Sequence, residues 1–233
     1  MTTTFSEPFL RLTEAHSAWG AEQLETFNAF LPMGEWSADL GQCLYRQSGR
    51  ELRISLLGTF DTDERSWLWA WANPGFQGTP VVRAAEEVRQ YGEAHGLREF
   101  TEELIHLAGH DDPRLAAENL AFTAMGVLGA AGYIGVQANP SARAYLVPDD
   151  PQVPRAEPDA ITLPRVLLTG AGLIGGSARH VVDGYVAHHA LPRREAPGRI
   201  SAGLPDGGTV DVLFDDLDRI ASVRVNTGGP APA

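Results

Sequence analysis

The sequence predicts a mixed α+β fold, in which an antiparallel sheet meander is packed by helices and is followed by a small C-terminal module of helix and antiparallel strands. Apolar and polar residues alternate with a period of two between residues 40 and 56 and again at residues 67–72, as they do in β-strands. In three other segments apolar residues recur every three or four positions, which is the spacing of amphipathic helices. These segments are 14–31, 79–95 and 113–128.

The first helix is expected after a short lead-in of residues 1–13, and Pro32 with Gly34 ends it. Three strands should follow, separated by short polar turns, so that they form an antiparallel meander. We expect the first strand between Trp36 and the break at Gln47-Ser48-Gly49, and the other two near residues 52–56 and 67–72.

The second helix should begin with Thr79 as N-cap and Pro80 in its first turn, and should end near His95-Gly96. Residues 97–109 fit a helix and a strand equally well. Asp112-Pro113 opens the third helix. Residues 133–136 and 142–147 predict two short extended segments, the second of them an edge strand.

Residues 148–160 contain four prolines and four acids with almost no apolar residue, a composition typical of linkers. We therefore predict a domain of residues 1–147 that carries the tryptophan strand, a linker of residues 148–160, and a small module of residues 161–233. Within this module we expect one or two helices over residues 161–191, followed by three strands. The strands are expected near residues 199–201, 209–214 and 220–225.

The composition excludes several classes of protein. All 18 basic residues are arginine, so no lysine is available for a Schiff base with pyridoxal phosphate or for a P-loop. A net charge of −12 argues against nucleic-acid binding, which needs a basic surface. The acidic surface would instead suit a protein partner of basic character.

The start of the chain, MTTTFSEPFL, has neither the basic nor the apolar region of a secretory signal, and no run of residues is long and apolar enough to span a membrane. A single cysteine, Cys43, cannot form an internal disulfide. We therefore expect a cytoplasmic protein. Its oligomeric state cannot be read from the sequence.

The stretch Trp67-Leu68-Trp69-Ala70-Trp71-Ala72-Asn73 is the most distinctive part of the chain. On a single strand, Trp67, Trp69 and Trp71 would line one face. Two interpretations are open. The apolar residues between the indoles favour a core strand buried on both faces, whereas stacking on the indole rings would make a ligand site of these three residues and Asn73.

The same stretch, continued by Pro74 and followed by the segment VRQYGEAHGL at residues 88–97, resembles a family of uncharacterised proteins from high-GC bacteria that is known only as a domain of unknown function. The likeness covers roughly residues 10–147. The resemblance implies a fold shared with this family, but it implies no activity, cofactor or catalytic residue.

Glu102, His106 and His110 are spaced four residues apart, so a continuous helix would present them on one face. Two imidazoles and a carboxylate can bind a metal ion and leave a position open for water. The alternative is that Gly109 and Asp112-Pro113 end the helix, in which case both histidines are solvated residues.

Two further patterns lack parts of the sites that they resemble. Residues 170–176 match the glycine spacing of a dinucleotide site, but too little chain follows for the parallel strands of that fold, so we expect a glycine-interrupted helix or loop and no cofactor. His180, His188 and His189 lie near Asp183 without a nearby nucleophile.

The sequence therefore favours a non-enzymatic binding or protein-interaction module. A metal-dependent enzyme and a small-ligand protein remain the alternatives.

Overall fold

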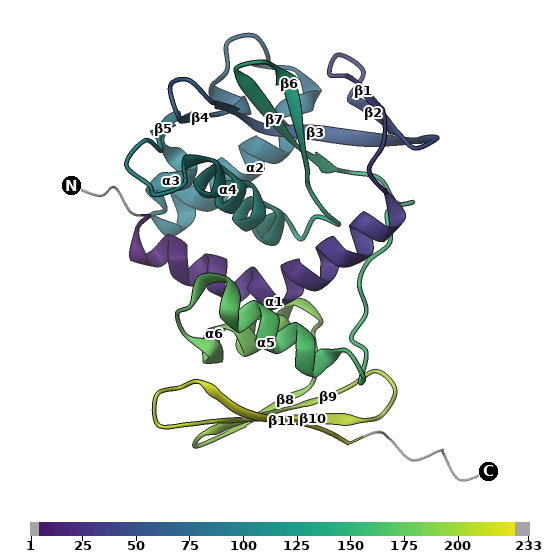
Figure 1. Cartoon of the computed structure of the whole chain (residues 1–233), viewed down its shortest axis with the longest axis vertical. Coiled ribbons are helices and arrows are strands. Elements are labelled where there is room, and N and C mark those ends of the chain that lie inside the picture. Colours follow the sequence, from purple (N-terminus) through teal and green to yellow (C-terminus); the bar gives the residue numbers. More distant parts are fainter. Residues whose placement is uncertain (1–4, 227–233) are drawn as a thin grey trace. The chain divides into compact units, whose positions relative to one another are not determined.

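The computed structural model describes residues 5–226, and its mixture of helices and antiparallel sheets is the predicted α+β fold (Figure 1). The chain forms two compact units. The first comprises Met1–Phe9 and Gln23–Arg155, and the second comprises Leu10–Glu22 and Ala156–Ala233. The middle of the first helix therefore belongs to the second unit. The predicted domain boundaries at residues 147 and 161 stay a prediction.

The first unit combines a seven-stranded antiparallel sheet with helices. Its strands are β1 (Trp36–Asp39), β2 (Leu44–Gln47), β3 (Arg50–Asp61), β4 (Ser66–Trp69), β5 (Leu104–His106), β6 (Ile134–Asn139) and β7 (Ala142–Pro148). Its helices are α2 (Arg83–His95), α3 (Arg98–Thr101), α4 (Pro113–Leu128) and the 3-10 turns η1 (Ala70–Ala72) and η2 (Pro80–Val82), together with both ends of α1 (Glu7–Phe30).

The meander predicted from the alternating residues is confirmed, because the strands pair in the order β1-β2-β3-β4-β5. The first predicted strand is two strands, β1 and β2, joined by a turn in which Cys43 has a φ of 55°. The prediction that residues 142–147 form an edge strand is wrong. This strand, β7, pairs with β3 on one side and β6 on the other, and its last five residues are buried.

The tryptophan stretch is a strand only as far as Trp69, and Ala70–Ala72 form the 3-10 turn η1. Trp71 therefore does not continue the face that Trp67 and Trp69 were expected to form. Gly58 of β3 makes room for the first indole, since a Cβ at this position would lie 2.7 Å from the Trp67 ring. Local alternation predicted the strand but could not place its end, because the chain turns where tertiary packing requires it.

The ends of the helices in this unit are set by capping residues close to them in the sequence. Ser6 accepts a hydrogen bond from the backbone N–H of Phe9 at the start of α1, which begins seven residues earlier than the predicted position 14. Asp112 accepts from the N–H groups of Arg114 and Leu115 and so caps α4 where Asp112-Pro113 predicted it. Gly96 ends α2 in the left-handed conformation. The ambiguous residues 97–109 contain the short helix α3 and the strand β5.

The second unit contains helices α5 (Leu163–Ile174) and α6 (Ala178–His188), the middle of α1, and a four-stranded antiparallel sheet in the order β11-β10-β9-β8. The strands are β8 (Arg193–Ala196), β9 (Arg199–Gly203), β10 (Thr209–Phe214) and β11 (Ile220–Asn226). Gly170 lies so close to Ala18 of α1 that a Cβ on it would be 2.5 Å from the Ala18 Cα. The absence of side chains at such positions lets these helices pack backbone to backbone. No helix within residues 5–226 is long and apolar enough to cross a membrane.

Candidate functional site

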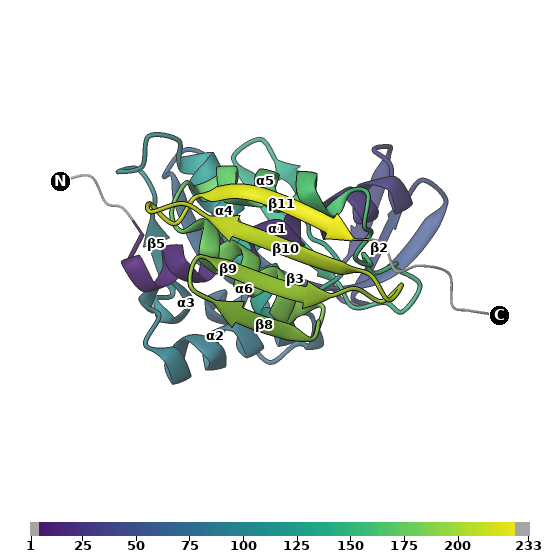
Figure 2. The ribbon, with the colours of Figure 1, turned by 90° about the horizontal axis from the view of Figure 1, so that it is seen from below.

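The sheet of β8 to β11 has one packed face and one open face, which Figure 2 shows from the open side with α5 and α6 behind the strands. Alternate residues of β9 and β10 are buried on the packed face, because successive side chains of a strand point to opposite faces. These residues are Ile200, Ala202, Val210, Val212 and Phe214. The residues between them project from the open face and are half-buried or exposed.

A row of polar side chains crosses this open face. Arg194 of β8 is opposite Ser201 of β9, Ser201 is opposite Asp211 of β10, and Asp211 is opposite Arg224 of β11. Opposed residues on one face have Cβ atoms about 5 Å apart. The four side chains therefore form a continuous row, and we call it the cross-strand row.

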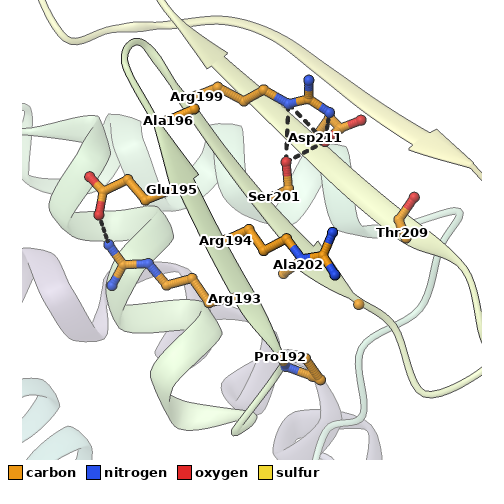
Figure 3. A pocket seen from close by; sticks show the side chains of 11 residues that line it. Pro192, Arg193, Arg194, Glu195, Ala196, Arg199, Ser201, Ala202, Thr209 and Asp211 are labelled. Carbon is orange, nitrogen blue, oxygen red and sulfur yellow. Dashed lines mark hydrogen bonds and ion pairs between the residues drawn. The ribbon is translucent and has the colours of Figure 1, made fainter.

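Asp211 is held as an anion within the row. Its Oδ1 accepts hydrogen bonds from Arg199 Nε at 3.0 Å, from Arg199 Nη2 at 2.5 Å and from the Ser201 hydroxyl at 2.6 Å (Figure 3). The Ser201 and Arg199 hydrogen bonds, with a smaller effect of the Arg224 charge, lower the pKa of the Asp211 carboxyl. A carboxylate whose pKa is lowered is a weak base, so this arrangement suits binding better than proton transfer.

A groove of about 560 Å³ runs over β8, β9 and the start of β10 on this face. Figure 3 shows Arg194, Ser201 and Asp211 along it, with Thr209 at one end. Part of its floor is Gly203, where the atoms nearest to a Cβ would be those of Pro192, at 3.7 Å and beyond. Charged and hydroxyl side chains line the groove, although most of its exposed lining surface is apolar, and it has room for a backbone to lie close to the sheet.

The arginines around the groove differ in their partners. Arg193 forms ion pairs with Asp183 of α6 at 3.0 Å and with Glu195 at 2.6 Å. Arg199 is occupied by Asp211. Within residues 5–226 the guanidinium of Arg194 has no carboxylate partner, so its planar set of N–H donors is available to a ligand.

A second polar cluster in this unit is internal. His16 Nδ1 of α1 lies 2.7 Å from His188 Nε2 of α6, and the Trp19 indole stacks on the His188 ring at 4.0 Å. Burial and the neighbouring His188 lower the pKa of His16 to about 3, and burial and His189 lower the pKa of His188 to about 4. Both rings are therefore neutral near pH 7.

Glu22, on the same helix as His16, accepts two hydrogen bonds from α6 and the residue that follows it. The Tyr185 hydroxyl donates to Glu22 Oε1 at 3.1 Å, and His189 Nε2 lies 3.1 Å from Glu22 Oε2. Burial and the Glu22 carboxylate raise the pKa of the Tyr185 phenol. These hydrogen bonds hold α6 against the middle of α1. Because the raised pKa makes the Tyr185 phenol harder to ionise, this residue does not suit nucleophilic chemistry.

The tryptophans predicted as core or ligand site lie inside the first unit. Trp67 and Trp69 are fully buried, and their rings meet edge to face at 5.1 Å. The Trp69 indole N–H donates to the Glu99 carbonyl oxygen at 2.9 Å. Trp71 packs under the Arg89 guanidinium, and Asn73 accepts a hydrogen bond from the Gly75 N–H in a turn. A ligand could reach the Trp67 and Trp69 rings only if this unit opened.

The helix assumed for Glu102, His106 and His110 does not form, because His106 belongs to β5 and the other two residues lie outside regular elements. All three nevertheless line one small pocket of about 190 Å³. The His110 ring packs against Phe5 at 4.5 Å. Among the described residues, no three histidine, cysteine or acidic side chains are grouped closely enough to hold a metal ion.

The glycine-rich residues 170–176 contain the second half of α5 and its glycine C-cap, Gly175, as the helical interpretation expected. They do not follow a strand, which a dinucleotide-binding turn requires. His180 lies 3.6 Å from Glu14 and belongs to the helix contacts of the second unit.

The sequence indicated part of the groove but not its position. The alternation of Arg199 and Ser201 with Ile200 and Ala202 marks a polar strand face, and the strand itself was predicted. β8 has no alternating apolar residues and was missed. No local signal could show that Arg194 lies in one row with Asp211, because strand register is set by tertiary pairing.

A family model described as a family of unknown function (DUF6882) matches residues 10–151. The matched residues include the tryptophan stretch and the helix after it, where the family resemblance was expected. The bacterial origin that was expected with it stays a prediction. No curated protein and no solved structure matches the chain.

Proposed function

We propose that this chain, which belongs to the family of unknown function DUF6882, is a non-catalytic binding protein that holds a partner protein against the open face of its four-stranded sheet. The observation that carries the proposal is the groove over β8 and β9, in which the guanidinium of Arg194 faces no carboxylate of the described chain. A guanidinium without a carboxylate partner in a groove can donate hydrogen bonds to acceptor groups of a bound protein.

The remaining groups of the groove support binding rather than catalysis. Arg199, Ser201 and Asp211 satisfy one another, so they shape the surface without leaving a reactive group. The described residues that line the groove include no histidine and no cysteine, and the chain has no lysine. This lining can supply hydrogen bonds and charge from its arginines together with apolar contact from residues such as Pro192 and Ala196.

The proposal can be tested with a photo-crosslinking amino acid placed at Thr209, which lines the groove, and at Leu217 as an exposed control in the β10–β11 turn. A protein captured specifically at position 209 should then be purified and bound again to the intact chain. We expect Gly203→Val, which fills the groove, to weaken this rebinding at least tenfold, since the added side chain occupies the contact surface.

Ala221→Val, which adds side-chain volume to an exposed position of β11 outside the groove lining, should leave the rebinding unchanged. Equal capture at positions 209 and 217, or rebinding that Gly203→Val leaves intact, would overturn the proposal. So would catalytic turnover by the purified chain that Gly203→Val abolishes.

A second candidate function is metal binding in the first unit by Glu102, His106 and His110. It is supported by the placement of all three residues around one pocket, although a shared metal ion would require their side chains to move together. Elemental analysis after purification without chelator tests it. Zinc, nickel, manganese and iron all below one equivalent, with no change on His106→Ala, would remove this candidate.

A further inference from the structure

We infer that the partner presents an acidic segment in extended conformation, which lies across the strands and places two carboxylates on Arg194 and Arg224. This inference rests on the proposed binding function and names the chemistry of the partner. It also replaces the basic partner expected from the net charge, because the local charge of the groove is positive whereas the net charge of the chain is negative.

Charge is the first argument. The chain has a net charge of −12. The cross-strand row and the neighbouring Arg199 nevertheless contain three arginines and only one carboxylate, that of Asp211. Glu195, which also lines the groove, is paired with Arg193 at 2.6 Å. The groove is thus locally cationic on an acidic protein, and complementary charge favours an anionic partner there.

The second argument is that the surface already holds a carboxylate. Asp211 is bound by two nitrogens of Arg199 and by the Ser201 hydroxyl, which is the way an arginine fork and a hydroxyl receive an acidic side chain. Arg194 and Arg224 flank this pair at the two ends of the row. Arg194 is opposite Ser201, and Arg224 is opposite Asp211. Each arginine can donate hydrogen bonds to a further carboxylate.

The third argument is spacing. Arg194 and Arg224 lie on β8 and β11, which are three strand steps apart, and neighbouring strands are about 4.8 Å apart, so the two backbones are separated by about 14 Å. In an extended peptide each residue advances about 3.3 Å, so side chains at i and i+4 are about 13 Å apart and point the same way. Acidic residues four apart therefore match the two arginines.

The middle of such a segment would pass above Ser201 and Asp211. A third acidic residue at i+2 would lie near the Asp211 carboxylate and be repelled, whereas a serine or threonine could donate a hydrogen bond to it. The floor at Gly203 and the small Ser201 side chain leave the peptide backbone room to approach. The expected motif is acid, any residue, hydroxyl residue, any residue, acid.

The test is an NMR titration of the full chain with two capped seven-residue peptides of equal charge. One peptide carries glutamates four residues apart with threonine between them, and the other carries the same glutamates two residues apart. We expect amide shifts on β8 to β11 and at least fivefold tighter binding of the first peptide. Arg194→Gln and Arg224→Gln should each weaken it roughly five- to tenfold, since each removes a charge-assisted pair.

Arg46→Gln, which makes the same charge change at an exposed arginine of the first unit, is the matched control and should alter the affinity less than twofold. Arg194→Lys keeps the charge but loses the fork, so it should be intermediate. If Arg194→Gln failed to fold, the lysine variant and Arg224→Gln would still decide the result.

Equal affinity for the two peptides, equal loss in Arg46→Gln and Arg194→Gln, or no shift on β8 to β11 would each overturn the inference. Its failure is distinguishable from failure of the binding function. If a captured partner still depends on position 203 while neither peptide binds, the groove binds a partner of another chemistry. If Gly203→Val leaves capture unchanged, the binding function itself fails.

Discussion

Nδ1 of His16 and Nε2 of His188 are 2.7 Å apart, so a single proton between them joins α1 to α6 in the second unit. Because burial lowers both pKa values, to about 3 and about 4, the native state excludes protons that the unfolded chain takes up below its ordinary histidine pKa of 6.5. The free energy of unfolding therefore rises with pH in the window between about 3 and 6.5 and is at its full value above it.

We predict that His16→Leu flattens this dependence. The maximal slope that one such histidine contributes is about 1.4 kcal/mol per pH unit, and removing the His16 imidazole takes away its share. Urea unfolding between pH 4 and 7 measures the slope. His95→Gln removes an exposed imidazole from the end of α2 and serves as control. A slope in His16→Leu equal to that of the parent chain would contradict the prediction.

Two glycines of the same helix should respond to alanine with opposite signs. A Cβ at Gly170 would lie 2.5 Å from the Ala18 Cα, whereas a Cβ at Gly172 would meet nothing within 4 Å. We expect Gly170→Ala to lower the free energy of unfolding by about 1–3 kcal/mol through overpacking. Gly172→Ala should raise it by about 0.5–1 kcal/mol, because alanine loses less conformational entropy in a helix.

Denaturant unfolding of both variants, followed by circular dichroism, tests this pair. The two substitutions add the same methyl group to α5, so any general effect of alanine on the helix cancels in the comparison. Stabilisation by Gly170→Ala would contradict the 2.5 Å approach of a Cβ at Gly170 to Ala18 of α1.

The two fully buried tryptophans should differ in their tolerance of phenylalanine. The Trp69 N–H donates to the Glu99 carbonyl oxygen, while the Trp67 N–H is buried and has no hydrogen-bond partner in the described part of the chain. Both substitutions remove similar volume. Trp69→Phe also leaves the buried carbonyl oxygen without its donor, so it should cost about 1–2 kcal/mol more. Thermal unfolding of the two variants gives the difference, and an equal or larger loss in Trp67→Phe would refute it.

Tyr185 should stabilise the second unit through its hydroxyl group. The hydroxyl donates to Glu22 at 3.1 Å, and both side chains are buried. Tyr185→Phe keeps the ring but leaves Glu22 with His189 alone, so we expect a loss of about 1.5–3 kcal/mol, the range for a hydrogen bond to a charged group. Tyr91→Phe, at a partly exposed tyrosine of α2, is the control in chemical unfolding. A loss in Tyr185→Phe no larger than in Tyr91→Phe would argue against the bond.

The candidate site was only partly predictable. The sequence singled out Trp67, Trp69 and Glu102 because their residue types and spacing are unusual. Which side chains share a face, however, depends on whether the segment forms a helix or a strand. The strand ends at Trp69, and residues 104–106 are a strand rather than part of a helix. The groove residues Arg194 and Asp211 are ordinary exposed residues in the sequence, and only strand pairing makes them neighbours.

The sequence by itself determined the features that depend on neighbouring residues: the α+β class, the cap at Asp112, the left-handed stop at Gly96, and the alternation that marks β9 and β10. The tertiary structure alone decided that β7 is central and that Arg194, Ser201 and Asp211 form one row. The physical reason is that capping and periodicity act within a few residues, whereas strand order and register depend on burial shared by segments far apart in the chain.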